Sequence, residues 1–357
     1  MAILVGIDEA GFGPILGPLV VSSSAFRVPD NLIWANHWEI LRASVSDKRT
    51  SLKGRLLIVD SKKAFTRTIG IKHLRRTVLA TLKHLGTEPK NLTELISSLC
   101  PDCLDHIAEY PWYKKTGDYQ LGPDAADIGI AVSMLRADLA NQHIELLGLK
   151  SRCLEVAHYN RMVTAVDNKA KVLFTAVAEL MQSAIDAFAN DDLDMVIDRQ
   201  GGRSHYQRQL QLMFGESQLR IIHEDQDRSS YELTEKTITA EHAENAETRS
   251  EAKSPLRKNN IKTSANSAVS AVKQVRRVRV HFVVGADSKF LPVSLASMAC
   301  KYLREVLVEN INNYFLSFNP AIKPTAGYWQ DGLRFIEDIK THIPNLSFNA
   351  NQLIRCR

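Results

Sequence analysis

The sequence predicts an α/β domain whose sheet is interrupted by two insertions. Short apolar runs rich in β-prone residues are mixed with stretches of helical periodicity along the 357 residues. Acidic residues stand directly after three of the apolar runs. This mixture is typical of a sheet covered by helices, with polar chemistry gathered at the strand ends.

The N-terminal elements are read from apolar spacing. Residues 2–7 are rich in Ile and Val and are stopped by charge, which predicts a short buried strand. Glycines and prolines then punctuate a turn over residues 11–18. Further strands are expected over residues 19–26 and 55–59. Apolar residues recur at helical spacing over residues 71–84, which predicts a helix with a basic outer face.

The middle of the chain contains the first insertion. Residues 86–146 are expected to form an inserted subdomain that closes with a helix over residues 127–146. An extended stretch is expected over residues 147–157. A strong amphipathic pattern then predicts a helix over residues 168–190, and a short apolar strand over residues 193–197 ends on Asp198.

The C-terminal third contains the second insertion. Residues 234–272 are polar, with Glu in the first half and Lys and Arg in the second, and are expected to be disordered or weakly helical. Strands are expected over residues 219–223 and 275–284, and helices over residues 295–314 and 331–341. The expected domain boundaries are 1–85 for the first part of the main domain, 86–146 for an inserted helical subdomain, 147–233 and 273–315 for the remainder of the main domain, 234–272 for the disordered insertion, and 316–357 for a C-terminal helical extension.

Composition excludes several classes of protein. The formal net charge of +5 permits a polyanionic partner without demanding one. No apolar run approaches the roughly 18 residues that cross a bilayer, so no membrane association is expected. The apolar N-terminus is short and lacks a basic leader, so a signal peptide is not expected. Five cysteines are an odd number in a large chain, which argues against a disulfide framework and is typical of a reducing compartment. We therefore expect a cytoplasmic protein, and a monomer.

The acidic residues suggest the chemistry. Asp8 with Glu9, Asp198 and Asp287 each follow an apolar run. Carboxylates gathered at strand ends repel one another unless cations lie between them, and oxygen ligands suit Mg²⁺ or Mn²⁺. Two such ions can promote phosphodiester hydrolysis.

Two observations weigh against this interpretation of the acidic residues. Any one Asp at a strand end is more simply explained as the start of a turn. Asp8 and Glu9 are neighbours, which on a regular strand point to opposite faces. Both can line one site only if the strand bends or ends there, which Gly11 makes plausible.

Five segments resemble the motifs of the ribonuclease HII family, in the family's order. They are residues 6–18 (GIDEAGFGPILGP), 60–63 (DSKK), 196–198 (VID), 285–301 (GADSKFLPVSLASMACK) and 327–328 (GY). The resemblance covers roughly the whole chain except residues 86–146 and 225–275.

The resemblance implies a ribonuclease H-like fold, with a central mixed sheet flanked by helices and a C-terminal helical part. It implies hydrolysis of the RNA strand of RNA–DNA hybrids, or at embedded ribonucleotides, leaving 3′-hydroxyl and 5′-phosphate ends. Asp8, Glu9, Asp198 and Asp287 would be the catalytic residues and the ligands of two Mg²⁺ or Mn²⁺ ions. Gly11 and Gly13 would approach the ribose 2′-hydroxyl, and Tyr328 would stack near the junction between ribonucleotide and deoxyribonucleotide. The residues implied to contact the nucleic acid are Gly11, Phe12, Gly13, Ser61, Lys62, Lys63, Arg199, Arg203, Lys301 and Tyr328.

The sequence also departs from the family. Phe12 stands where the family usually has Arg, which removes a charge that could meet a phosphate. Arg199, Arg203 and His205 are candidates to replace that contact, and a glycine turn with solvated side chains is the equal alternative. Two other functions stay open: a nuclease of the same fold that cuts structured DNA, and a non-catalytic nucleic-acid-binding homologue. The presence of all four acids with Lys62 and Lys301 argues against the latter.

Two further groups are given structural interpretations. Cys100 and Cys103, with His106 nearby, could form half a zinc site or a redox pair, but a structural zinc needs four ligands and Cys153 is distant in sequence. The aromatic residues at 110, 112 and 113 could stack on bases, but beside proline they are expected to form a local core contact.

Overall fold

Seven strands form one mixed sheet in the computed structural model of the chain, which describes residues 1–66, 68–122, 125–235 and 276–356. Its order is β5-β2-β1-β6-β9-β8-β7. The three central strands β1, β6 and β9 run parallel, and the others are antiparallel to their neighbours. The strands are β1 Ala2–Ala10, β2 Leu19–Val28, β5 Glu145–Leu154, β6 Leu193–Asp198, β7 Ser217–Glu224, β8 Arg228–Glu235 and β9 Val278–Val283. The expected central mixed sheet is confirmed.

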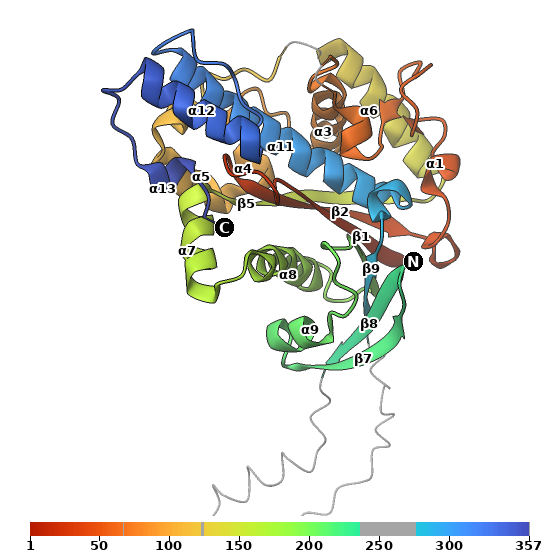
Figure 1. The fold of residues 1–357 in the computed structure, drawn as a ribbon. Coiled ribbons are helices and arrows are strands. Elements are labelled where there is room, and N and C mark those ends of the chain that lie inside the picture. The colour runs from red at the N-terminus through yellow and green to blue at the C-terminus, as the bar shows by residue number, and fades with distance from the viewer. Residues whose placement is uncertain (67, 123–124, 236–275, 357) are drawn as a thin grey trace, which may run out of the picture.

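Helices cover both faces of this sheet, which gives three layers (Figure 1). One face carries α3, α4, α6, α11 and α12, and the other carries α7, α8 and α9. The helices are α1 His37–Ile40, α2 Ser61–Ala64, α3 Lys72–His84, α4 Leu92–Leu99, α5 Leu104–Ala108, α6 Ala125–Asn141, α7 Val156–Val166, α8 Lys169–Ala187, α9 Gln207–Met213, α11 Leu291–Leu316, α12 Trp329–His342 and α13 Ala350–Leu353. Shorter elements are the strand pair β3 Val45–Ser46 and β4 Leu56–Leu57 and the 3-10 turns η1 Asp30–Leu32, η2 Pro101–Cys103, η3 Pro111–Tyr113 and η4 Ala286–Ser288.

Strand β1 lies at the centre of the molecule and is buried along almost all of its length. Alternate side chains enter two separate apolar clusters: Leu4 packs on the α11 side, and Ile3 and Val5 pack on the α8 side. A strand covered on both faces needs apolar residues at successive positions, and this explains the continuous run that the sequence shows at its N-terminus.

Helix α11 crosses β1 and β2 at very short range. A Cβ atom built on Gly6 would lie 2.2 Å from the carbonyl carbon of Pro292, so only glycine fits there. The Ser24 hydroxyl donates a 2.7 Å hydrogen bond to the Pro292 carbonyl, which fixes the same crossing from the neighbouring strand. This contact sets the position of the residues that follow on α11.

The structure differs from the expected elements in a few places. The helix expected over residues 127–146 ends at Asn141, because His143 adopts a left-handed conformation (φ 54°) and the chain turns into β5. Strand β8 and helices α7 and α9 were not anticipated. Apolar residues of residues 86–146 join the same buried cluster as α11. Of residues 234–272, only Thr234 and Glu235, the end of β8, lie within the described residues.

Within the described parts of the chain, no helix has the length and apolar character to cross a membrane.

Candidate active site

The three parallel strands bring the predicted acidic residues to one edge of the sheet. Ile7 of β1 pairs with Ile197 of β6, so Asp8 and Asp198 come next at the same level. Asp198 in turn pairs with Val283, the last residue of β9, and Asp287 follows four residues later. The carboxyl ends of parallel strands are where ligands bind in open α/β sheets. The alignment therefore gathers side chains that are almost 280 residues apart in sequence.

Asp198 is fixed by the turn that carries Asp287. The backbone amide of Ala286 donates a 2.7 Å hydrogen bond to Oδ1 of Asp198. This turn is made possible by Gly285, which has φ 61° and leads into η4. Burial raises the pKa of Asp198 above its ordinary value. The end of β6 and the beginning of η4 thus hold each other in place.

Asp8 is buried and faces α11. It accepts hydrogen bonds from the backbone amide of Glu9, at 2.8 Å, and from the side chain of Ser297 on α11. Burial raises the pKa of Asp8 well above its ordinary value, and the negative charges of Glu9 and Asp198 add to the effect. A carboxyl group in this setting is costly to ionise unless a cation compensates the charge.

Glu9 lies on the opposite face of β1 from Asp8. Pairing with β2 continues without a break through Ala10, which is paired with Val20, so β1 does not bend at Asp8 and Glu9. Glu9 lies near Tyr206, on the α8 side, and its charge raises the pKa of that phenol after burial has done so. Burial and the charge of Asp198 raise the pKa of Glu9 itself to about 7. The bend that would aim both side chains into one site is absent.

Asp60 is a further acidic residue of this group; the sequence placed it in the motif over residues 60–63, but it was not among the expected ligands. Its side chain accepts a 2.9 Å hydrogen bond from the Lys62 amide and so caps α2. Burial raises the pKa of Asp287 to about 6, and the charge of Asp60 and a hydrogen bond between the two carboxyl groups contribute. Asp60 directly follows an apolar run, as the other acidic candidates do, and this position was the signal in the sequence that could have identified it.

Lys62 is the cation of the cluster. Partial burial acts to lower the pKa of Lys62, but the charges of nearby carboxylates, led by Asp60 and Asp287, raise it overall. The same amino group lowers the pKa of Glu9 and of Asp198. The structure therefore brings Lys62 into the acidic group.

The donor atoms suit a hard divalent cation, but their arrangement is not preformed. All four predicted ligands are carboxylates; burial raises the pKa values of Asp8 and Asp287, and repulsion by neighbouring carboxylates raises them further. Among the described residues, no three His, Cys, Asp or Glu side chains are grouped as a metal site requires. Asp8 and Glu9 lie on opposite faces of β1, so both can bind one ion only if the chain or these side chains rearrange when the ion binds.

Three other predicted contact residues lie around this cluster. Ser61 is buried, and its hydroxyl oxygen lies 3.0 Å from that of Ser297, the residue that also holds Asp8. Lys63 is exposed on α2. Lys301 forms a 2.6 Å ion pair with Glu305 and lies 4.7 Å from the ring centroid of Phe65.

The turn over residues 11–18 rests on the buried Arg304. A Cβ atom on Gly11, which has φ 95°, would lie 2.6 Å from Nε of Arg304, so packing alone accounts for this glycine. The Arg304 guanidinium donates to the carbonyls of Leu16, at 3.3 Å, and Ala326, at 3.2 Å. By contrast, a Cβ atom on Gly13 would meet nothing within 4 Å, so no internal contact requires glycine there.

Tyr328 is brought to the same turn from the other side. The amides of Ile15 and Leu16 donate to the Gly327 carbonyl at 2.8 and 3.1 Å. The Arg304 guanidinium lies 6.0 Å from the centroid of the Tyr328 ring, and that ring is half-exposed. The turn over residues 11–18, called the glycine turn below, and Tyr328 therefore share one surface.

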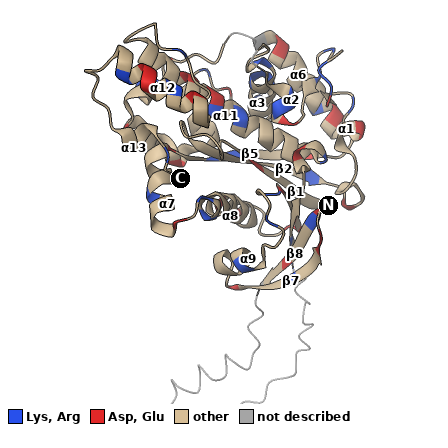
Figure 2. Ribbon diagram, in the orientation of Figure 1, with Lys and Arg blue, Asp and Glu red and all other residues tan. Residues whose placement is uncertain are grey.

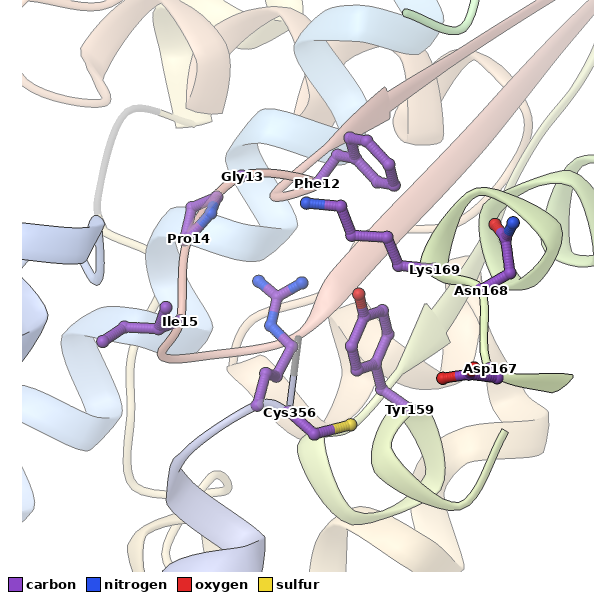
Figure 3. Close-up of a pocket in the computed structure, with 10 residues that line it drawn as sticks. Phe12, Gly13, Pro14, Ile15, Tyr159, Asp167, Asn168, Lys169 and Cys356 are labelled. Carbon is purple, nitrogen blue, oxygen red and sulfur yellow. The ribbon is translucent and has the colours of Figure 1, made fainter. Parts of the chain in front are cut away.

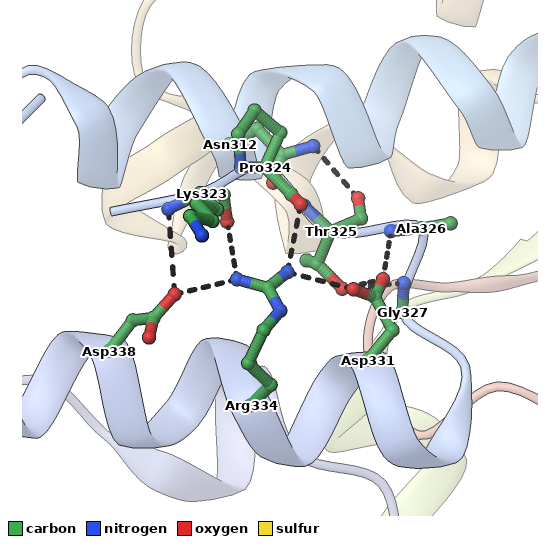
Figure 4. A network of polar contacts seen from close by, with 9 residues as sticks. All are labelled: Asn312, Lys323, Pro324, Thr325, Ala326, Gly327, Asp331, Arg334 and Asp338. Carbon is green, nitrogen blue, oxygen red and sulfur yellow. Dashed lines mark hydrogen bonds and ion pairs between the residues drawn. The ribbon is translucent and has the colours of Figure 1, made fainter. Parts of the chain in front are cut away.

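A polar network fixes the segment before Tyr328 (Figure 4). Arg334 on α12 donates to the carbonyls of Lys323 and Pro324 at 3.0 and 2.9 Å and pairs with Asp331 and Asp338. Asp331 also accepts from the Thr325 hydroxyl and the Ala326 amide, both at 2.7 Å. The first turns of α12 thus fix the position of the segment that contains Gly327 and Tyr328.

Arg199, Arg203 and His205 all contact other residues of the chain, although His205 is exposed. Arg199 donates to the carbonyls of Gln226 and Asp225 and to the Ser229 hydroxyl. The Arg203 guanidinium lies 5.5 Å from the Tyr206 ring centroid, and His205 is 2.8 Å from a carboxylate oxygen of Glu224. These contacts hold the β7–β8 hairpin against the preceding loop and favour a structural role over replacement of the phosphate contact.

The cysteines form a group that the sequence alone did not indicate. The Sγ atoms of Cys100 and Cys103 are 3.3 Å apart, and Cys103 also forms a hydrogen bond with Cys153 of β5. Distance in sequence was therefore a poor reason to set Cys153 aside. All three are buried free thiols. The neighbouring aromatic residues Trp112 and Tyr113 are buried against α11, which confirms the expected core contact.

Charge is distributed over the helices without strong segregation. On α11 and α12, basic and acidic residues are interleaved (Figure 2). Two basic residues at the start of β9 are paired: Arg277 with Asp192 at 2.6 Å and Arg279 with Asp194 at 2.8 Å.

No protein-family model matches the sequence, and no curated protein matches it. Solved structures do align with it. A chain in the complex of PCNA with ribonuclease HII from Archaeoglobus fulgidus aligns over 99% of this chain and 94% of that one, with 14% identity and a TM-score of 0.41. Bst-RNase HIII in complex with Mn²⁺ aligns over 99% and 66%, with 12% identity and a TM-score of 0.39. Ribonuclease H2 from Pyrococcus horikoshii aligns over 98% and 92%, with 11% identity and a TM-score of 0.35.

Proposed function

We propose that this chain is a metal-dependent nuclease of the ribonuclease HII type, which cleaves the RNA strand of RNA–DNA hybrids or at embedded ribonucleotides. The observation that carries the proposal is the parallel alignment of β1, β6 and β9, which gathers Asp8, Asp198 and Asp287 at one sheet edge. Purely structural Asp residues have no reason to converge where each one's charge opposes the others.

Asp8, Glu9, Asp198 and Asp287 would hold Mg²⁺ or Mn²⁺, with Asp60 beside them. When bound, such ions activate water and stabilise the leaving oxygen in phosphodiester hydrolysis. The protein's own part is positioning: Ser297 orients Asp8, and the Ala286 amide orients Asp198. Lys62 would contact a phosphate oxygen next to the cluster, and the half-exposed Tyr328 ring offers a stacking surface beside the glycine turn.

The test is a cleavage assay on a duplex that holds one ribonucleotide, in Mg²⁺ and in Mn²⁺. Cleavage 5′ to the ribonucleotide, lost with EDTA and in Asp8→Asn, is expected. The matched control is Asp192→Asn. Asp192 immediately precedes β6, at the end of the strand away from Asp198, and its carboxylate pairs with Arg277. Cleavage of all-DNA junctions in place of the ribonucleotide duplex would redirect the proposal to a structured-DNA nuclease. Binding without cleavage in either metal would identify a non-catalytic protein.

A further inference from the structure

A cavity of about 460 Å³ opens beside the glycine turn, on the α8 side of the sheet (Figure 3). Phe12, Gly13 and Pro14 form one wall, and the α7–α8 junction and the chain around Arg355 form the others. Phe12 follows Glu9 by three residues, so the rim lies at most about 11 Å along the chain from the proposed active site. The cavity is therefore within a few nucleotides of that site on a bound strand.

Lys169 contributes an exposed cation to the wall of the cavity. Its Nζ atom lies 5.2 Å from the centroid of the Phe12 ring. The picture shows its amino group directed toward Phe12 and the turn (Figure 3). Among the described residues, the Lys169 ammonium has no ion pair, and its side chain is exposed. Its charge is free to meet an anion from solution.

Arg355 contributes a second cation, and this one is buried. It is only 4% exposed, and its Nε and Nη1 atoms have no hydrogen-bond partner among the described residues. The guanidinium lies 5.0 Å from the Tyr159 ring centroid, and Nη2 donates a 3.5 Å hydrogen bond to the Pro18 carbonyl. Burial, together with the charge of Arg304, lowers the pKa of Arg355 to about 9. Among the described residues its partners are the Pro18 carbonyl and the Tyr159 side chain, so no negative charge compensates this buried guanidinium, and an anion in the cavity would do so.

The N-terminus of α8 adds a third favourable element. This 19-residue helix begins at Lys169, and the Asn168 side chain caps it by accepting from the amides of Ala170 and Lys171. The positive end of the helix dipole therefore points at the cavity, as in many anion sites. Among the ten residues that line the cavity, Asp167 is the one acidic side chain, against the two cations.

We infer that this cavity binds a backbone phosphate of the nucleic-acid strand, held between Lys169 and Arg355 at the start of α8. The inference rests on the proposed function for the choice of a nucleic acid as ligand. It gives Phe12 a different part from that of a phosphate-binding arginine: its ring supports Lys169, which carries the charge. Lys169 and Arg355 would act as positioning residues that set how the strand lies across the acidic cluster.

The experiment measures binding without cleavage. Fluorescence anisotropy with a labelled hybrid duplex and a DNA duplex of the same sequence is run in EDTA over a series of KCl concentrations. Loss of one phosphate contact is expected to reduce the slope of log K against log [KCl] by about 0.9 and to weaken binding on the order of tenfold at 0.1 M salt. Lys169→Gln should show the smaller slope and the weaker binding on both duplexes. Lys169→Arg should return both quantities to the wild-type values.

Lys171→Gln is the matched control, because Lys171 is exposed two residues further along the same helix and does not line the cavity. Arg355→Gln should act like Lys169→Gln, and Arg355→Lys should retain most of the affinity. If Arg355→Gln fails to fold, the exposed Lys169 still decides the matter. Equal affinity and slope for Lys169→Gln and Lys171→Gln would overturn the inference.

A free nucleotide is the other source of phosphate. Stabilisation of the wild-type protein by adenosine 5′-monophosphate, lost in Lys169→Gln while duplex binding is unchanged, would also overturn the inference. Because the binding assay contains no divalent metal, its outcome is independent of whether the protein cleaves RNA. Failure to cleave with intact effects of Lys169→Gln would reject the proposed function and leave the phosphate site standing.

Discussion

The backbone amide of Ala286, the residue before Asp287, donates a 2.7 Å hydrogen bond to Oδ1 of Asp198. One carboxylate oxygen thereby fixes the turn that presents the next carboxylate. Asp198 ends β6 and Asp287 lies in η4 after β9, but the two acids behave as one structural unit. Substitutions at Asp198 consequently affect both charge and geometry, and the two effects can be separated.

We predict that Asp198→Asn keeps the fold and loses cleavage, whereas Asp198→Ala loses both cleavage and stability. Asparagine retains an oxygen for the Ala286 amide, while alanine leaves that amide without its partner, which costs about 1–3 kcal/mol. Urea denaturation in EDTA measures the difference. Equal stability of the two variants would show that the bond to Ala286 contributes nothing.

Metal binding should be visible in thermal stability. Without metal, Asp8→Asn should raise the melting temperature slightly, because it removes one of several repelling charges around a buried group. Adding Mg²⁺ or Mn²⁺ should raise the melting temperature of the wild-type protein, by mass action, and much less that of Asp8→Asn. Differential scanning fluorimetry with and without Mg²⁺ measures this difference. A concentration of about 10 mM exceeds the millimolar dissociation constant of a weak site. A metal response that is identical in the two proteins would contradict the assignment of Asp8.

The network around Arg334 should control the position of Tyr328. Arg334→Ala removes hydrogen bonds to the Lys323 and Pro324 carbonyls, so we expect a loss of about 1–3 kcal/mol in unfolding free energy and weaker binding of the hybrid duplex. Lys340→Ala is the control on the same helix, since its ion pair with Glu337 is exposed and contributes about 0.5 kcal/mol or less. Unchanged duplex binding in a destabilised Arg334→Ala would separate this network from the substrate.

His37 should make the fold sensitive to acid. Burial lowers the pKa of His37 to about 4, below the value near 6.5 expected for an unfolded chain. The unfolded state then binds the proton first, so stability is lost as the pH falls from about 6.5 to 4, by about 3 kcal/mol at most. His37→Gln should lose less stability than the wild-type protein between pH 7 and pH 4.5 in urea titrations. The exposed His342→Gln should follow the wild-type curve, and an identical curve for His37→Gln would contradict the prediction.

Cys100 and Cys103 should form a disulfide under mild peroxide. Hydrogen bonds from Cys100 and Cys153 lower the pKa of Cys103 to about 5, so its thiolate is the nucleophile. The thiolate attacks peroxide to give a sulfenic acid and water, and the Cys100 thiol then displaces a second water as the S–S bond forms. Peptide mass spectrometry should find this pair 2 Da lighter, a mass loss that follows from the two hydrogens removed. Cys100→Ser should instead leave Cys103 as a sulfenic acid. Oxidation confined to the exposed Cys356 would count against the prediction.

The local sequence predicted most elements that have a strong period. The run over residues 2–7 and the amphipathic pattern over residues 168–190 correspond to β1 and α8, because burial of one or two faces imposes a period on residue type. The caution that Asp8 and Glu9 point to opposite faces also came from strand geometry, and the unbroken pairing to Ala10 agrees with it. By contrast, β8 was missed, since its polar residues show no apolar run.

The sequence by itself determined which residues are acidic, where apolar runs stop, and that the chain forms a mixed sheet with helices. Only the tertiary structure decided that β1, β6 and β9 are parallel neighbours, that Asp60 joins Asp287, and that Lys169 and Arg355 share a cavity with Phe12. The physical reason is range. Periodicity and turn chemistry act over a few residues, whereas strand order and the meeting of charges depend on long-range packing, which no local window of the sequence contains.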